Sequence, residues 1–127
     1  MTYMVPGRLP DTTVINQMLV IRHAFAAAGG GSPDDVAIFN ANAPFGFRIV
    51  DTRFYISTGV ALATVQLRDA TAGAGNVLSD SIVAAATGAL LNTLKTATDT
   101  IATNGTLVLR RSDSGVAGEV VVFLMKT

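Results

Sequence analysis

The stretch TLVLRRSDSGVAGEVVVFLMKT, residues 106–127, decides the fold class of this chain. It predicts two strands around a turn, which together would form a final hairpin. In the second strand, residues 120–125 read VVVFLM and contain no polar side chain. A surface strand of a small antiparallel domain usually alternates between a wet face and a dry face. We therefore expect both faces to be covered, one by the core and the other by another protein chain.

The composition favours a single domain whose surface is largely buried by partners. The chain has 127 residues, half of them apolar and 14% charged, against about 25% charged in typical soluble domains. Nine basic residues balance nine acidic ones, so little field is left to attract nucleic acid or an anionic membrane. The mean hydropathy of +0.47 is high. It indicates either a membrane protein or extensive contact with other chains.

The membrane interpretation fails on length. A spanning helix needs about 20 mainly apolar residues, and Arg22, His23, Asp69 and Lys95 interrupt such windows. The first residues show no pattern of a secretory signal. The absence of cysteine rules out disulfides, thiol catalysis and cysteine-based metal sites. It fits a protein made in a reducing cytoplasm.

Residues 1–12 differ from the remainder of the chain. Pro6 and Pro10 favour extended backbone in this segment, yet it holds more apolar side chains than a disordered tail would. We interpret it either as an extended arm that lies on a partner or as a frayed terminus. Residues 13–127 are expected to form one β-sandwich domain.

The hydrophobic pattern after residue 12 is that of short strands. Residues 14–25 fit a strand or a helix, with β-branched residues favouring the strand. In residues 45–57 the apolar parity changes near Asp51, which predicts a bulge or a corner between sheets. Residues 61–68 and 77–83 are expected to be strands, while residues 84–94 fit either helix or strand. Together these segments predict an all-β, antiparallel, jelly-roll-like sandwich of about eight strands.

The residues that could carry chemistry do not form a recognisable site. His23 is the single histidine and is expected to be solvated or at the edge of the core. Asp34 and Asp35 follow a glycine run, where turn formation and solubility explain them. Arg110 and Arg111 should face opposite sides of a strand, with Asp113 and Glu119 as their expected partners. We predict no catalytic, cofactor or metal site, and hence that the chain is not an enzyme.

Partner contacts are expected at two places instead, the arm and the last strand. The predicted contact residues are Tyr3, Met4, Val5, Leu9, Val120, Val122 and Leu124.

Three stretches resemble a known family. VAIFNANAPFGFRIVDTRFYIS at 36–57, ATVQLRDATAGAGNVLSDSI at 63–82 and DTIATNGTLVLRRSDSGVAGEVVVFLM at 99–125 are similar to small cement or decoration proteins of tailed-bacteriophage capsids. The resemblance covers residues 36–126 and rests on strand and turn order. It implies a jelly roll on the outer surface of the virion, made in the host cytoplasm and bound to the major capsid protein. It also implies a homotrimer, or alternatively a homodimer, with an N-terminal arm on the shell, and it transfers no active-site residue.

Other functions remain open at this point. The same sandwich would serve another virion module, in the tail, the neck or the base of a fibre. A carbohydrate-binding jelly roll is a further alternative, disfavoured because the chain has no tryptophan and no calcium-type carboxylate cluster.

The arm hypothesis makes a direct prediction. Deletion of residues 1–10 should weaken attachment to the capsid while the β-domain still folds, because the arm would touch the shell and not the core. Co-sedimentation with capsids and circular dichroism measure the two properties. Attachment that survives the deletion unchanged would show that the arm has no such role.

Overall fold

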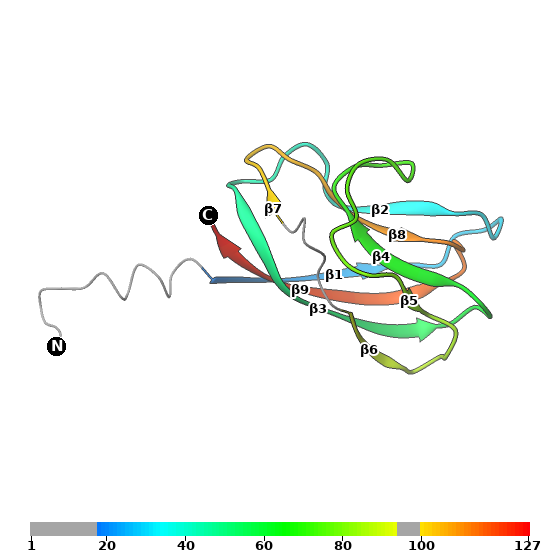
Figure 1. Cartoon of the computed structure of the whole chain (residues 1–127). Coiled ribbons are helices and arrows are strands. Elements are labelled where there is room, and N and C mark those ends of the chain that lie inside the picture. Colours follow the sequence, from blue (N-terminus) through cyan, green and yellow to red (C-terminus); the bar gives the residue numbers. More distant parts are fainter. Residues whose placement is uncertain (1–17, 94–99) are drawn as a thin grey trace, which may run out of the picture.

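The computed structural model describes residues 18–93 and 100–127. In them the chain forms nine strands and no helix, arranged as two antiparallel sheets packed face to face (Figure 1). The strands are β1 (Met18–Phe25), β2 (Asp34–Phe39), β3 (Phe47–Thr58), β4 (Thr64–Arg68), β5 (Ile82–Val83), β6 (Leu90–Thr93), β7 (Thr100–Ile101), β8 (Leu107–Arg111) and β9 (Ala117–Lys126). The predicted all-β sandwich is confirmed. The expected arm lies outside the described residues.

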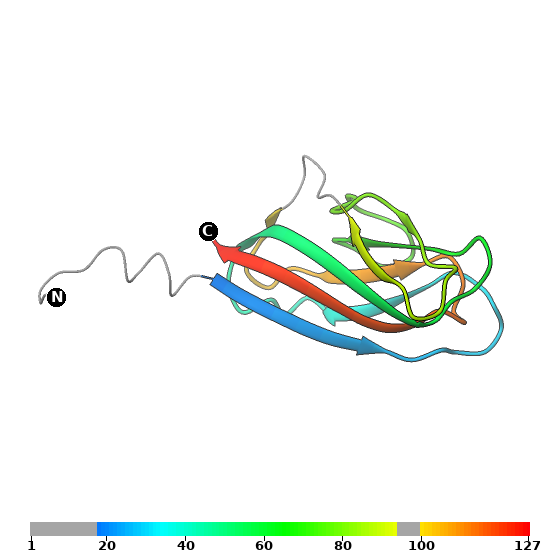
Figure 2. The ribbon, with the colours of Figure 1, turned by 90° about the horizontal axis from the view of Figure 1, so that it is seen from below.

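The strand order is consistent with the predicted jelly roll. Sheet A has the order β1-β9-β3-β6, with β7 also pairing with β3, and sheet B has the order β2-β8-β4-β5. The chain passes repeatedly from one sheet to the other, so that neighbours within a sheet come from distant parts of the sequence. Figure 2 shows β1 and β2 along one side of the sandwich and β6 along the opposite side.

The predicted final hairpin is wrong in its pairing. β8 and β9 are both strands, but β8 pairs with β2 and β4 in sheet B, whereas β9 pairs with β1 and β3 in sheet A. The turn between them therefore carries the chain across the sandwich. Strand propensity locates the two strands, but it does not specify which strands they pair with.

β9 is the strand that the sequence singled out, and its two faces differ. Val120, Val122 and Leu124 are fully buried in the core between the sheets, at 0% exposure. Val121, Phe123 and Met125 lie on the outer face of sheet A and are half-buried. The prediction that Val120, Val122 and Leu124 contact a partner is therefore wrong. Side chains alternate along a strand, so these three point into the core of their own domain.

β3 confirms the predicted change of parity. Its pairing with β9 shifts register between Ile49 and Asp51. The shift allows Phe47 and Ile49 before it and Phe54 and Ile56 after it all to be buried in the core. A bulge that inserts one residue has this effect.

The edge of the sandwich formed by β5 and β6 differs from expectation. In place of a continuous strand over residues 77–83, the structure has β5, an isolated bridge between Val77 and Arg68 and a further bridge residue at Ser79. The sequence of residues 84–94 fits either a helix or a strand. In the structure, residues 84–89 are irregular and the strand β6 follows them. Backbone hydrogen bonds from Val60 to Ala84 and from Ala84 to Ala63 hold the irregular segment to the loop before β4. These loop contacts replace the pairing of longer strands.

Gly118 marks a close approach of β9 to β3. A Cβ atom at this position would lie 1.9 Å from the carbonyl oxygen of Tyr55. Glycine therefore allows the two backbones to approach where the pairing shifts register again, between Ile56 and Thr58.

The two faces of β9 can be compared with the same substitution. Val122→Ala removes fully buried methyl groups and should lower the free energy of unfolding by about 2–3 kcal/mol. Val121→Ala should cost clearly less, because that side chain remains partly in water. Urea denaturation of both variants measures the difference. Equal losses would contradict the assignment of the two faces.

Candidate functional site

The described part of the chain offers no candidate metal site. Across residues 18–93 and 100–127, no group of three or more histidine, cysteine, aspartate or glutamate side chains lies close enough to hold a metal ion. His23 pairs with Val120 across β1 and β9 and is half-buried on the core side. This position matches the core-edge interpretation.

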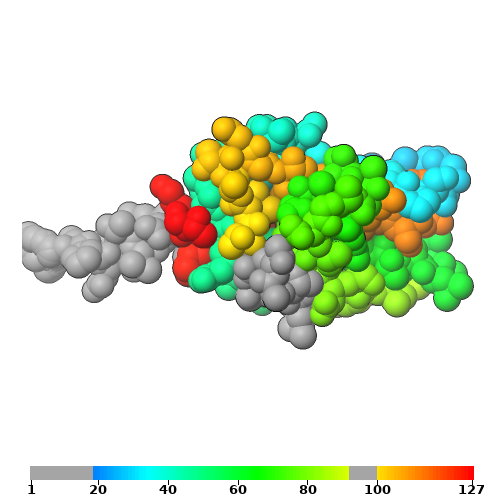
Figure 3. Space-filling view, turned by 45° about the horizontal axis from the view of Figure 1, so that its top comes forward, coloured from blue at the N-terminus to red at the C-terminus, as the bar shows by residue number. Residues whose placement is uncertain are grey.

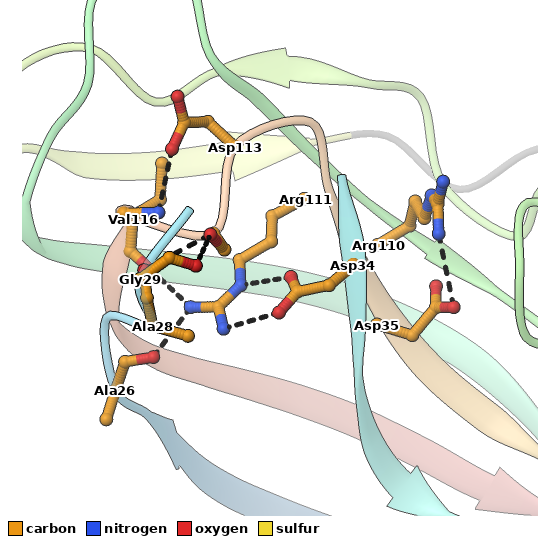
Figure 4. A network of polar contacts seen from close by, with 11 residues as sticks. Ala26, Ala28, Gly29, Asp34, Asp35, Arg110, Arg111, Asp113 and Val116 are labelled. Atoms are coloured by element: carbon orange, nitrogen blue, oxygen red, sulfur yellow. Dashed lines mark hydrogen bonds and ion pairs between the residues drawn. The ribbon is translucent and has the colours of Figure 1, made fainter. Parts of the chain in front are cut away.

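The two aspartates predicted to lie in a loop begin β2 instead. Asp34 is paired with Arg111 and Asp35 with Arg110 in the register of β2 and β8. Arg111 is 3% exposed, and its Nε and Nη2 atoms donate to the two carboxylate oxygens of Asp34 at 2.5 and 2.9 Å (Figure 4). The predicted partners of the arginines, Asp113 and Glu119, were wrong, because β8 lies beside β2 and not beside β9.

The guanidinium of Arg111 also holds the loop between β1 and β2. Its Nη1 donates to the backbone oxygens of Ala26 and Val116, at 2.7 and 2.5 Å. Ser114, from the turn after β8, donates its hydroxyl to the backbone oxygens of Ala28 and Gly29. We call Arg111, Asp34 and Ser114 the clasp. Its polar groups are occupied by one another and by backbone, as a structural role requires.

Arg110 and Asp35 lie on the outer face of sheet B beneath a loop. Arg110 Nη1 donates to Asp35 Oδ2 at 3.2 Å, and the backbone N–H of Ala72 donates to the same oxygen at 2.6 Å. The loop of residues 69–76 thus folds over this pair. Figure 3 views the molecule from this side, where the segment forms the green bulge. The doublet Arg110-Arg111 therefore makes no basic patch.

Among the described residues, four of the six exposed large apolar side chains lie on the outer face of sheet A. Val20 is 50% exposed, Val50 41%, Tyr55 44% and Leu90 82%. Val121, Phe123 and Met125 of β9 lie among them. These side chains come from β1, β9, β3 and β6, the strands of one continuous sheet. We call this surface the outer apolar face, consisting of Val20, Val50, Tyr55, Leu90, Val121, Phe123 and Met125.

Two ion pairs lie on this face. Arg22 donates to Glu119 at 2.8 Å, and this hydrogen bond, together with the charge of Glu119, raises the pKa of Arg22 above its ordinary value. Arg53 donates to Asp51 at 3.2 Å and also lies over the ring of Phe123, 5.3 Å from its centre. Arg48 lies on the same face and contacts Met125 Sδ at 3.6 Å, so the face is apolar with two ion pairs and a third arginine.

A shallow groove crosses the face. It has a volume of about 600 Å³, and its walls include Arg22, Glu119, Arg53, Tyr55 and Leu90. Aromatic side chains and arginine, which line this groove, are enriched at protein interfaces. Such a surface suits contact with another protein better than it suits chemistry on a small molecule.

The residues of β9 that were predicted to contact a partner are the ones that face the core, and the residues between them face outward. Tyr3, Met4, Val5 and Leu9 lie outside the described residues. Val121, Phe123 and Met125, the alternate residues of the same VVVFLM run, occupy the outer face in place of Val120, Val122 and Leu124. Which residues of β9 point inward depends on its pairing with β3, the strand in which the sequence predicted the change of parity near Asp51. Val20, Val50, Tyr55 and Leu90 could have been found only by placing their strands in the same sheet.

Comparisons with protein-family models, with curated proteins and with solved structures find no match for this chain. In the part of the chain that the structure describes, no helix has the length and apolar character needed to cross a membrane.

The clasp and an exposed ion pair can be compared by neutralising one carboxylate in each. Asp34→Asn leaves the buried charge of Arg111 without its partner and should lower the free energy of unfolding by about 2–3 kcal/mol. Glu119→Gln breaks the exposed pair with Arg22 and should leave the unfolding midpoint almost unchanged. Guanidinium denaturation measures both. If Asp34→Asn were as mild as Glu119→Gln, the clasp would have no stabilising role.

Proposed function

We propose that this chain is a virion structural protein that binds the outside of a bacteriophage capsid and cements it by bridging neighbouring major capsid subunits. The observation that carries the proposal is the outer apolar face, an exposed apolar sheet surface made of side chains from four strands. The resemblance of residues 36–126 to decoration proteins supplies the particular partner. A jelly-roll-like sandwich supports the proposal only weakly, because one fold serves many functions.

The charge pattern supports a protein partner. Arg22 and Arg53 already have acidic partners on the same face, so the surface offers few free cations to a phosphate backbone. Recognition then rests on shape and on apolar contact. Contiguous exposed apolar patches of this kind commonly mark interaction sites on soluble proteins.

Cementing would follow from mass action. A protein that binds only the assembled shell lowers the free energy of that state relative to the dissociated one. Many copies act on one particle, and a chain that contacts two subunits gains from the high effective concentration of the second contact. Modest affinity at each site is then sufficient to stabilise a shell loaded from inside by packed DNA.

Two leucines of similar exposure allow a matched test. Leu90 is 82% exposed on the outer apolar face, and Leu62 is 91% exposed in the loop between β3 and β4. Leu90→Asp should weaken binding to capsids that lack the protein by tenfold or more, because a carboxylate would be desolvated in the interface. Leu62→Asp should bind like the original chain. Co-sedimentation with expanded capsids of the phage that encodes the chain measures both.

Thermal unfolding of the two variants serves as the folding control, since neither leucine is buried. The original chain failing to bind such capsids, or binding instead to isolated tails, would refute the proposal. Equal weakening by both substitutions would show that the outer apolar face is not the surface that binds.

A further inference from the structure

The four sheet edges of the sandwich, formed by β1, by β6 together with the two-residue β7, by β2 and by β5, are unequally protected against pairing with another chain. An edge strand exposes unpaired N–H and C=O groups, and natural proteins protect such edges by short strands, charges or bulges. β5 has two residues and β6 has four. β2 begins with two aspartates and shifts register between Ala37 and Phe39. Each of these three edges carries at least one protective feature.

β1 lacks these features. It has eight residues without proline or glycine and pairs with β9 in continuous register from Met18 to Phe25. Its one formal charge, Arg22, is engaged by Glu119 of β9, away from the free edge. Within the described residues, β1 pairs with β9 alone and makes no other backbone hydrogen bond. A long regular row of backbone groups is thus left available.

The core is also incompletely closed along this side. Leu19 and Ile21 point toward the core from β1 but are only partly buried, whereas the core-facing residues Val120 and Val122 of neighbouring β9 are at 0% exposure. On sheet B, Val36, Ile38 and Phe39 of the edge strand β2 are partly buried as well. Both layers of the sandwich therefore leave apolar side chains half-covered on the side where β1 and β2 run (Figure 2).

We propose that the free edge of β1 pairs antiparallel with β1 of a second copy of this chain, which joins the two A sheets into one. Directly opposite residues of an antiparallel pair lie on the same face of the sheet. Core-facing residues must then meet core-facing residues across a two-fold axis. This condition allows only those registers in which the two-fold axis passes beside one residue of β1, so that this residue lies opposite the same residue of the second copy.

Charge and length select among these registers. An axis at Arg22 would place two guanidinium groups opposite each other, which is unfavourable. An axis at Val20 would pair only residues 18–22 of β1 with the second copy and leave the remainder of the strand unpaired. An axis at Ile21 pairs nearly the whole strand and places Arg22 opposite Val20 of the second copy. β1 is thus self-complementary in the register centred on Ile21, which argues for a second copy as the occupant of this edge.

The inference deepens the proposed function and, in its consequence for the capsid, rests on it. A two-fold axis perpendicular to the joined sheet keeps both outer apolar faces on the same side. A dimer could therefore lay two such faces on two neighbouring capsid subunits. The pairing is closed at two copies, which favours the homodimer over the homotrimer expected first from the sequence.

The test is the native mass of the full chain and of three single variants, measured by sedimentation velocity. The original chain should sediment at twice the chain mass of 13.1 kDa. Val20→Lys places a lysine opposite Arg22 of the second copy and should raise the dissociation constant of the dimer at least tenfold. Val20→Glu places a carboxylate there and should keep or tighten the dimer. Val50→Lys changes a valine that is 41% exposed, against 50% for Val20, on the same face but away from the edge, and should leave the mass unchanged.

A monomeric or trimeric original chain would overturn the inference. Dissociation by Val50→Lys as strong as by Val20→Lys, or equal effects of Val20→Lys and Val20→Glu, would overturn the assigned edge and register. Circular dichroism confirms that each variant is folded. Capsid binding is measured separately on the original chain, because Val20 and Val50 belong to the outer apolar face: a monomer that binds capsids would refute the dimer alone, and a dimer that does not bind would refute the proposed function alone.

Discussion

The pairing of β9 with β1 on one side and with β3 on the other is the interaction on which the rest of the structure depends. It brings the last strand of the chain into the middle of sheet A. The core-facing side chains Val120, Val122 and Leu124 then close the interior against sheet B. The same pairing fixes the phase of the alternate residues, so it also creates the outer apolar face. Stability and the candidate binding surface thus follow from one strand.

The clasp explains how the chain reaches this arrangement without a β8–β9 hairpin. Arg111 ends β8 in sheet B and holds the start of β2, the first residue of the loop after β1 and the turn that leads into β9. A buried guanidinium is expensive to desolvate unless its donors are occupied, and here the carboxylate of Asp34 and two backbone oxygens occupy them. The sequence predicted Asp113 and Glu119 as partners of the arginine doublet, whereas Arg111 is buried with Asp34 as a structural element of the sandwich.

The fold class could be predicted from the sequence because it depends on local pattern. Alternation in β4, the parity change near Asp51 and the apolar run in β9 each have a local physical cause. The pairing of the strands could not be predicted in the same way, because strand propensity does not specify that β8 pairs with β2 in sheet B and not with β9. The face of VVVFLM was assigned incorrectly for the same reason: all six residues are apolar, and only the neighbouring strands set which three point inward. The outer apolar face was missed because its members come from four strands that are distant in sequence.

The central claim is that the outer apolar face is the surface that meets a capsid. An electron cryomicroscopy map of capsids incubated with the purified chain would test it most directly. The account predicts density for the sandwich on the outside of the shell, with Tyr55, Leu90 and Phe123 toward the major capsid protein. Density with this face turned to solvent, or located only at the tail or neck of the particle, would contradict it.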